Sequence, residues 1–385
     1  MTLITDSTTL EKFCDDLSDE PFITVDTEFM REKTYWPQLC LVQIGGSKTA
    51  AVIDALAQNM DLSPLFKLFD KPKIIKVFHA ARQDLEIFLH LNGRLPAPLF
   101  DTQVAAMVCG FGESVGYEQL VAKLADARLD KGSRFTDWSA RPLSARQISY
   151  ALADVTHLRV AYQKLSIRLE QENRTNWIEE ELEILRTPQT YMPDPMKAYQ
   201  RIKGKKGNGK FLVILRELAA WREREAQHRN VPRNRILRDE ALIEIAHHVP
   251  LQPRALSRTR GLSENAANGS LGLAIIETVN QALEIPVENW PQLPPRLSLP
   301  SGTGPVTDLL KVFLKKVSDD FDVAGRLIAS SADLEQIAGF GEDAKVSALQ
   351  GWRREIFGSD ALRLCNGKLA LSIINKKLTV QESSN

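Results

Sequence analysis

The first half of the chain alternates short apolar runs with helical patterns. Apolar runs at residues 21–29, 39–46, 50–54, 73–79 and 98–101 predict strands. Apolar residues that recur every three or four positions predict helices at 63–69, 83–91, 102–111, 117–125 and 144–172. This order predicts an α/β domain whose helices gather towards its C-terminal side.

After about Thr187 the strand pattern disappears. Residues 211–229, 239–248 and 271–284 have helical periodicity, and the second half is predicted to be all-α. Stretches rich in Pro and Gly near 187–195 and 285–305 predict linkers. We therefore expect three domains, at 1–194, 207–286 and 304–378, and the two small helical ones are expected to pack against a neighbour.

Composition narrows the class of protein. The 385 residues are 43% hydrophobic and 25% charged, which is typical of a folded globular chain. The sequence has no apolar run of membrane-spanning length and no signal peptide at its start. Its four cysteines form no CxxC pair, which argues against a zinc finger, a redox motif or a disulfide framework. A soluble cytoplasmic protein with no membrane partner is expected.

The formal net charge of zero hides an uneven distribution. Residues 195–260 contain 16 basic and 6 acidic side chains, whereas residues 1–194 contain 21 basic and 28 acidic ones. A strongly basic segment is a candidate surface for a polyanion, and the acidic first region could hold cations.

Two carboxylates on one predicted strand are the first candidate residues for a catalytic or metal-binding site. Side chains alternate along a strand, so Asp26 and Glu28 lie on one face and Thr27 on the other. Such a pair at the end of an apolar strand is costly unless a cation neutralises it. A DxE pattern also arises by chance about once in a chain of this length, so alone it is weak.

Three further residues extend this set. Tyr150 and Asp154 are four positions apart on a predicted helix and share one face, although a buried Tyr with an Asp at the solvent edge is the plainer interpretation. Asp84 lies in the first turn of a helix after a strand, where a carboxylate is often only a cap. Together, four carboxylates in one α/β domain match the oxygen ligands of a two-metal phosphoryl-transfer site.

Residues 20–165 resemble the DEDD 3′→5′ exonucleases of the Tyr-containing subgroup, and closely the ribonuclease D family. The segments that carry the resemblance are VDTEFMREKTYWPQLCLVQIGG, FHAARQDLEIF, DTQVAAMVCG and TDWSARPLSARQISYALADVTHL. The resemblance implies a ribonuclease H-like fold with a mixed central sheet flanked by helices. It also implies hydrolysis of RNA from the 3′ end, with release of nucleoside 5′-monophosphates, and tRNA precursors or other structured RNAs as substrates.

The same resemblance assigns roles to the five residues. Asp26 would bridge two divalent cations, Mg²⁺ or Mn²⁺. Glu28 and Asp154 would complete the shell of the first cation, and Asp84 would serve the second through water. Tyr150 would orient the attacking water, while the metal supplies most of its activation.

Other motifs are weaker. His79 follows an apolar run and could contact substrate, although a structural role is at least as plausible. His247 and His248 are adjacent on a helix and cannot readily share a metal. The stretch GKKGNGKF (204–211) nearly matches a phosphate loop, but Phe211 replaces the required Ser or Thr and no strand precedes it, so no nucleotide cofactor is expected.

The basic region resembles a known helical module. Residues 208–285 are similar to the HRDC domain of ribonuclease D and RecQ-type helicases, and 305–378 resemble it more distantly. The resemblance implies that these modules help to hold nucleic acid, and Arg233, Arg235 and Arg238 are the candidate phosphate contacts. Solvated helix faces explain many such charge runs equally well.

Two alternatives remain open at this stage. The same carboxylates and the same helical module also occur in DNA-directed 3′→5′ exonucleases of repair, and no residue reads a 2′-hydroxyl. The chain could also be a catalytically inactive nucleic-acid-binding adaptor with a degenerate nuclease fold. The complete set of five site residues argues against this, because loss of activity should have cost at least one of them. A monomer is assumed by default.

Overall fold

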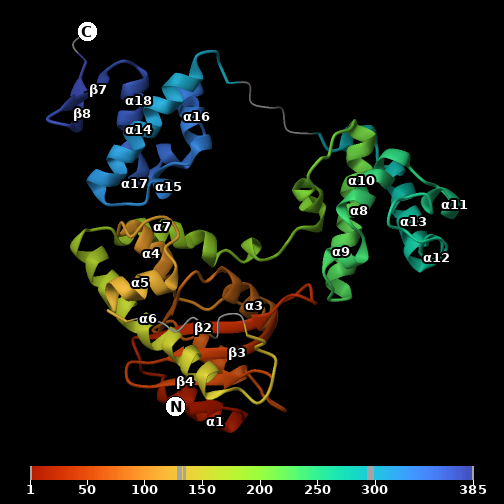
Figure 1. Ribbon diagram of the computed structural model, residues 1–385, viewed down its shortest axis with the longest axis horizontal. Coiled ribbons are helices and arrows are strands. Elements are labelled where there is room, and N and C mark those ends of the chain that lie inside the picture. Colours follow the sequence, from red (N-terminus) through yellow and green to blue (C-terminus); the bar gives the residue numbers. More distant parts are fainter. Residues whose placement is uncertain (1, 128–131, 133–135, 293–298, 384–385) are drawn as a thin grey trace.

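A six-stranded mixed sheet forms the centre of the N-terminal domain (Figure 1). The computed structural model describes residues 2–127, 132, 136–292 and 299–383. The strand order is β1-β4-β3-β2-β5-β6, in which β3 is antiparallel to both of its neighbours and the other pairs are parallel. The strands are β1 (Thr2–Ile4), β2 (Phe22–Met30), β3 (Gln38–Gly45), β4 (Ala50–Asp54), β5 (Ile75–Phe78) and β6 (Leu99–Asp101).

The alternation along β2 assigns a different layer to each of its faces. Ile23 and Val25 belong to the core with α1 (Ser7–Asp16), α2 (Ser63–Phe69) and α3 (Arg82–Asn92). Thr24, Asp26 and Glu28 face the opposite side, towards the long helix α6 (Ala145–Gln171). The carboxylates therefore lie on the face covered by α6.

Helix α6 approaches the sheet closely at one point. The hydroxyl of Thr24 donates to the carbonyl of Val155 on α6 at 2.8 Å and lies 3.2 Å from the carbonyl of Gly45 on β3. A Cβ at Gly45 would lie 2.5 Å from the Thr24 hydroxyl and 3.3 Å from the Val155 carbonyl, so only glycine leaves room for this helix. The contact places Asp154, the neighbour of Val155, beside β2.

Three more helices complete this domain. They are α4 (Thr102–Val108), α5 (Tyr117–Leu124) and α7 (Thr175–Arg186), and they pack with the C-terminal part of α6 in a second core. Ser144 and Gln147 form a capping box that starts α6.

A first helical module follows two 3₁₀ turns, at Pro188–Thr190 and Pro195–Arg201. Its core surrounds α8 (Gly209–His228), with α10 (Asp239–His248) and α13 (Ser270–Glu284) packed on it. Short helices complete it: α9 (Arg233–Ile236), α11 (Pro253–Leu256) and α12 (Glu264–Asn268), with a 3₁₀ turn at Val287–Asn289.

A second module has a core of its own. Its helices are α14 (Thr303–Phe321), α15 (Gly325–Ile328), α16 (Ser331–Phe340), α17 (Gly351–Arg353), which continues into a π-helical turn at Arg354–Gly358, and α18 (Ser359–Cys365), with 3₁₀ turns at Gly341–Asp343 and Ser347–Leu349. It ends in an antiparallel hairpin of β7 (Leu369–Ile374) and β8 (Lys377–Glu382). The all-α prediction for the second half missed this hairpin.

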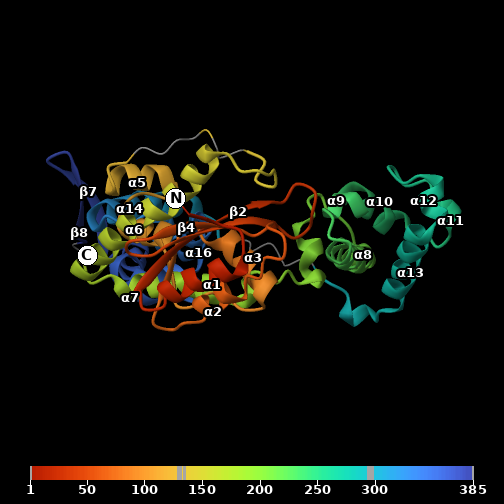
Figure 2. The ribbon, with the colours of Figure 1, turned by 90° about the horizontal axis from the view of Figure 1, so that it is seen from below.

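The modules contact different parts of the N-terminal domain (Figures 1 and 2). The first contacts the β2–β3 loop, where the Tyr35 hydroxyl donates to Glu223 of α8 at 2.5 Å. The second lies on α4 and α7, where the rings of Trp177 and Trp352 stack with centroids 4.4 Å apart. Arg353 adds ion pairs to the same helix α7. Each module thus packs against the N-terminal domain, as its small size predicted.

The predicted elements of the α/β domain are present, and the sheet and the helices match the predicted fold class. The sequence pattern did not predict β1, α1 or α7. Residues 293–298 of the predicted second linker lie outside the described residues. Among the described residues, no helix has the length and apolar character needed to cross a membrane.

Candidate active site

Three carboxylates meet between β2 and α6. Asp26, Glu28 and Asp154 each offer one oxygen atom, and these oxygens lie within 4.8 Å of one another. The register of β2 against β3 shifts at an irregularity between Glu28 and Phe29, directly after the two carboxylates, and pairing then continues at Phe29 and Met30. The two predicted motifs, on a strand and on a helix, therefore form one cluster.

A small cavity of about 130 Å³ opens at this cluster. It is lined by Asp26, His79, Tyr117, Tyr150, Asp154 and Leu158. Tyr150 and Asp154 are one helical turn apart on α6, and both reach the cavity. The predicted tyrosine, two of the carboxylates and the predicted histidine therefore share one space.

Tyr117, at the start of α5, belongs to this site although the sequence analysis did not select it. Its hydroxyl donates to the main-chain carbonyl of Asp154 and lies 3.3 Å from that of Ala153. These bonds hold the turn of α6 that carries the carboxylate. The contact joins residues 37 positions apart, and no local pattern in the sequence indicates it.

Asp84 stands apart from the cluster of three. It is buried in the first turn of α3, and the hydroxyl of Thr27 donates a hydrogen bond to its carboxylate. Thr27 can do so because it lies on the face of β2 opposite Asp26 and Glu28, towards α3. Asp84 still raises the pKa of Glu28, so the fourth carboxylate acts electrostatically on the cluster.

Burial and mutual repulsion make the carboxylates hard to ionise together. Burial, followed by repulsion from Asp26, raises the pKa of Glu28 to about 9, and burial raises that of Asp154 to about 7. Burial and Asp154 raise the pKa of Asp26, and burial and Asp26 raise that of Asp84. Joint ionisation of these carboxylates therefore requires a compensating positive charge nearby.

The donor set suits a divalent cation with a preference for oxygen. Carboxylates are the ligands that Mg²⁺ and Mn²⁺ prefer, and three of them converge here without a basic side chain in the lining of the cavity, apart from the imidazole of His79. Asp26, Glu28 and Asp154 are the residues that could hold such an ion.

His79 reaches the same cavity from the end of β5. Its Nδ1 lies 3.0 Å from the hydroxyl of Thr102, and its buried Nε2 has no hydrogen-bond partner among the described residues. Burial lowers the pKa of the imidazole, against the opposing effect of Asp101.

The three predicted arginines do not form one site. Arg233 lies 3.4 Å from Glu223 and lines a cavity of about 800 Å³ between the nuclease domain and the first helical module. Arg238 lines a different cavity together with Arg260, and Arg235 is exposed.

The larger cavity also contains basic residues that the sequence analysis did not select. Arg82 and Arg201 line it and have no ion pair among the described residues. Arg31 lies at the end of β2 and pairs with Glu86 through both of its terminal nitrogens. Arg82 and Arg31 are two and three residues along the chain from Asp84 and Glu28, although none of the four site carboxylates lines this larger cavity.

The histidine pair and the loop resembling a phosphate loop have structural roles. The ring of His247 stacks on Phe211 with centroids 4.2 Å apart, and His248 lies 4.0 Å from Glu244. Asn208, within the loop, caps the start of α8 through the main-chain N–H of Phe211.

Known protein families match both the N-terminal domain and the first helical module. A family model described as a 3′→5′ exonuclease matches residues 1–170, and the HRDC domain model matches residues 211–279. Ribonuclease D of Gluconacetobacter diazotrophicus is 50% identical over 371 residues, which are 96% of this chain and 94% of that protein. Ribonuclease D of Acidiphilium cryptum is 50% identical over 379 residues, which are 98% and 96% of the two chains.

A solved structure extends the likeness to the whole fold. The crystal structure of Escherichia coli RNase D, described as an exoribonuclease involved in structured RNA processing, superposes with a TM-score of 0.81 at 32% identity. The match covers 94% of this chain and 98% of that one. A structure from Bifidobacterium adolescentis shares the fold at 20% identity, with a TM-score of 0.69. The chain belongs to the ribonuclease D family of 3′→5′ exoribonucleases, enzymes that use divalent cations.

Proposed function

We propose that this exoribonuclease uses two divalent cations, Mg²⁺ or Mn²⁺, to release nucleoside 5′-monophosphates from RNA 3′ ends. The observation that carries the proposal is the convergence of Asp26, Glu28 and Asp154 within 4.8 Å, with Tyr150 lining the same cavity. When bound, the cations would supply Lewis acidity for the attacking water and for the leaving oxygen.

Each residue of the site has its own role in the proposed reaction. Asp26, Glu28 and Asp154 would hold the first cation, and Asp26 would also contribute to the second. Asp84, which lies outside the cluster of three and is bonded to Thr27, would serve the second cation through water. Tyr150 orients the attacking water, because its side chain shares the cavity with Asp26 and Asp154.

The substrate is RNA with a single-stranded 3′ end, and tRNA precursors and other structured RNAs are the proposed class. His79 lines the small cavity and would contact the terminal nucleotide there. Arg82, Arg201 and Arg233 would contact phosphates of the incoming strand in the larger cavity. Arg235 and Arg238 lie outside this cavity and are assigned to more distant phosphates.

The organisation that we propose divides the chain into an exonuclease domain at 1–194 and HRDC-type domains at 207–286 and 304–378. The two helical cores support this division. The enzyme is proposed to act in the cytoplasm as a monomer.

The test uses single-stranded RNA labelled at its 5′ end, and a matched DNA, with Mg²⁺, Mn²⁺ or chelator. The wild-type protein should shorten RNA from the 3′ end in a metal-dependent ladder, and Asp26→Asn should leave the RNA intact. Equal or faster cleavage of DNA would indicate that DNA is the substrate. Cleavage by Asp26→Asn would contradict the assigned metal site.

Substitutions in the larger cavity separate binding from chemistry. Arg82→Gln with Arg201→Gln should weaken RNA binding and reduce its salt dependence, with little change in turnover at saturating RNA. Arg254→Gln, on the far side of the first helical module, is the matched control. An unchanged salt dependence would remove the cavity from the proposed RNA path.

A further inference from the structure

Residues 136–143 form a segment that leads into α6 and carries a tryptophan to the catalytic tyrosine. The indole of Trp138 is 3% exposed, and its ring centroid lies 6.0 Å from that of Tyr150. It packs in the small core that also contains Ala151 and Leu152 of α6. Trp138 is therefore a direct neighbour of Tyr150, outside the lining of the carboxylate cavity.

Trp138 is not held by a hydrogen bond of its own ring. Its indole nitrogen is buried and has no partner among the described residues. The backbone around it is fixed instead, because Asp137 accepts hydrogen bonds from the N–H and the hydroxyl of Ser139. The position of the ring thus depends on how this short segment is attached to the sheet.

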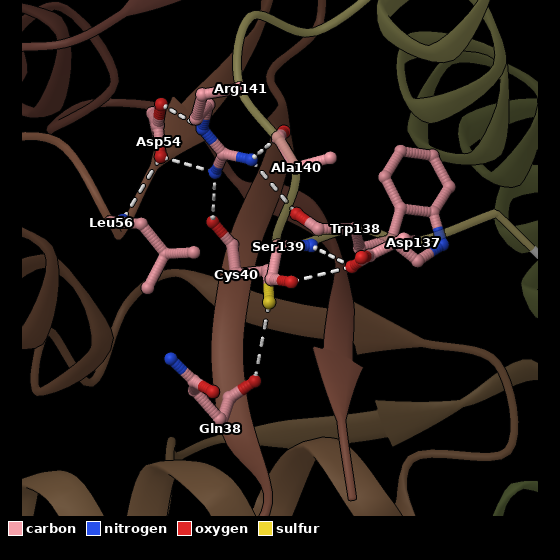
Figure 3. Close-up of polar contacts among 9 residues, drawn as sticks. All are labelled: Gln38, Cys40, Asp54, Leu56, Asp137, Trp138, Ser139, Ala140 and Arg141. Carbon is pink, nitrogen blue, oxygen red and sulfur yellow. Dashed lines mark hydrogen bonds and ion pairs between the residues drawn. The ribbon is translucent and has the colours of Figure 1, made fainter. Parts of the chain in front are cut away.

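Arg141 makes that attachment (Figure 3). Its Nε and Nη2 bind the two carboxylate oxygens of Asp54, at 2.7 and 2.5 Å. Its Nη1 donates to the carbonyls of Trp138 and Ala140, both at 2.8 Å, and Nη2 also donates to the carbonyl of Cys40 at 3.2 Å. These five bonds match the five N–H groups of a guanidinium, so every donor of the side chain has an acceptor.

The bonds join three separate pieces of the chain. Asp54 ends β4 and Cys40 lies on β3, whereas Trp138 and Ala140 belong to the segment before α6. The side chain of Asp54 is 7% exposed, so the pair is largely shielded from water. A lysine would keep the charge but could not span a bidentate carboxylate and three carbonyls.

We propose that Arg141 is a positioning residue for catalysis, which clamps the Trp138 segment to the sheet and thereby fixes Tyr150 against the indole. The inference rests on the proposed role of Tyr150 in orienting the attacking water. Neither Arg141 nor Trp138 lines the cavity of Asp26 and Asp154, so both act on the site through Tyr150, whose side chain hydrogen-bonds to the carboxylate of Asp154.

The experiment is a double-mutant cycle in the full-length protein. Arg141→Lys and Trp138→Leu are each made in the wild type and in Tyr150→Phe, and kcat and KM for 5′-labelled RNA are measured with Mn²⁺. Melting temperature and Mn²⁺ affinity by calorimetry are measured for every variant. Trp138→Leu provides a second route to the same question if Arg141→Lys does not fold.

The matched control is Arg159→Lys. Arg159 also joins α6 to the sheet, by donating to the carbonyls of Gly46 and Ser47 at 2.6 and 2.8 Å, but it lies beyond Asp154 on the helix. A loss of turnover caused by general loosening of α6 would appear in this variant as well.

Arg141→Lys and Trp138→Leu should each lower kcat about tenfold, as a misplaced catalytic group does. Their KM should stay within twofold of wild type, and Arg159→Lys should keep its kcat. In the Tyr150→Phe background the tenfold loss should vanish, because the positioned group is absent.

Two results would overturn the inference. One is an equal loss of kcat in both backgrounds, and the other is an unchanged kcat in Arg141→Lys and Trp138→Leu while Tyr150→Phe is impaired. Full activity of Tyr150→Phe itself would instead contradict the proposed function of the tyrosine, so the two failures are distinguishable.

Discussion

The hydroxyl of Thr27 donates a hydrogen bond to the carboxylate of Asp84, so the residue between the two strand carboxylates orients the carboxylate on α3. The alternation of β2 makes this possible, since Asp26 and Glu28 face α6 while Thr27 faces α3. One tripeptide therefore places two carboxylates directly and a third through its hydroxyl.

The first prediction concerns that hydroxyl. Thr27→Val keeps the shape of the side chain but removes the hydroxyl that donates to Asp84, which should lower the free energy of unfolding by about 1–3 kcal/mol. We expect at least a tenfold lower kcat under Mg²⁺, because the carboxylate of Asp84 then keeps only its main-chain hydrogen bond and is less firmly oriented. Thr27→Ser restores the donor and is the control, which should retain most of the turnover. Equal kinetics for Val and Ser at this position would contradict the role.

The second prediction concerns protons released on metal binding. The pKa values of about 9 for Glu28 and about 7 for Asp154 mean that these groups are partly protonated near pH 7 without a cation. Cation binding requires the ionised forms, so metal affinity should fall as pH drops from 9 to 6. Calorimetry at pH 7 in two buffers of different ionisation enthalpy should detect proton release, and the release should be smaller at pH 10.

The third prediction concerns the stability of the metal-free protein. Folded-state pKa values above those of the unfolded chain, about 4, mean that these carboxyls stabilise the fold most at low pH. That contribution is lost as pH rises through about 7 and 9, the values for Asp154 and Glu28. Asp26→Asn removes one repelling charge, so in chelator at pH 9 its melting temperature should exceed that of wild type.

Added Mg²⁺ should reverse this order. Wild type should gain melting temperature with Mg²⁺, because the cation binds only the folded state, and Asp26→Asn should gain little. An Asp26→Asn protein that is less stable than wild type in chelator at pH 9 would show that the three carboxylates do not repel one another.

The fourth prediction concerns the contact between the nuclease domain and the first helical module. Glu223 is 1% exposed and is contacted by the Tyr35 hydroxyl at 2.5 Å and by Arg233 at 3.4 Å. Tyr35→Phe removes the nearer partner of a buried carboxylate and should lower the free energy of unfolding by about 1–3 kcal/mol in urea. Tyr199→Phe, whose hydroxyl has no partner among the described residues, should stay near wild type.

Limited proteolysis gives a second readout of the same contact. Tyr35→Phe should accelerate cleavage in the basic stretch around residues 203–207, between the domain and α8, with no change at α14. Identical cleavage rates for Tyr35→Phe and wild type would mean that this hydrogen bond does not hold the module.

The sequence was sufficient for those parts of the site that depend on local periodicity. Asp26 and Glu28 were placed on one face by strand alternation, and Tyr150 and Asp154 by helical spacing. That these two elements meet required the family resemblance, because the contact depends on the close approach of α6 at Gly45. Local patterns do not encode such approaches.

Long-range partners were beyond prediction for the same reason. Tyr117 and the stack of Trp177 on Trp352 join residues far apart in the chain, and nothing in their immediate neighbours indicates the contact. Arg233, Arg235 and Arg238 were predicted as phosphate contacts from their charge and from the HRDC resemblance, and the fold places Arg233 and Arg238 in the linings of different cavities. The number of charged residues in a segment does not determine in which direction their side chains point.

Helix α6 has 27 residues, about 40 Å of continuous rod. Its first turns carry Tyr150 and Asp154, and near its end Arg168 binds Asp322 of the second helical module. A single residue inserted between Asp154 and Arg168 would rotate the rest of the helix by about 100°. The side chain of Arg168 would then point away from Asp322, and this contact with the second helical module would be lost. The number of residues between Asp154 and Arg168 therefore sets how the second helical module is oriented relative to the carboxylates.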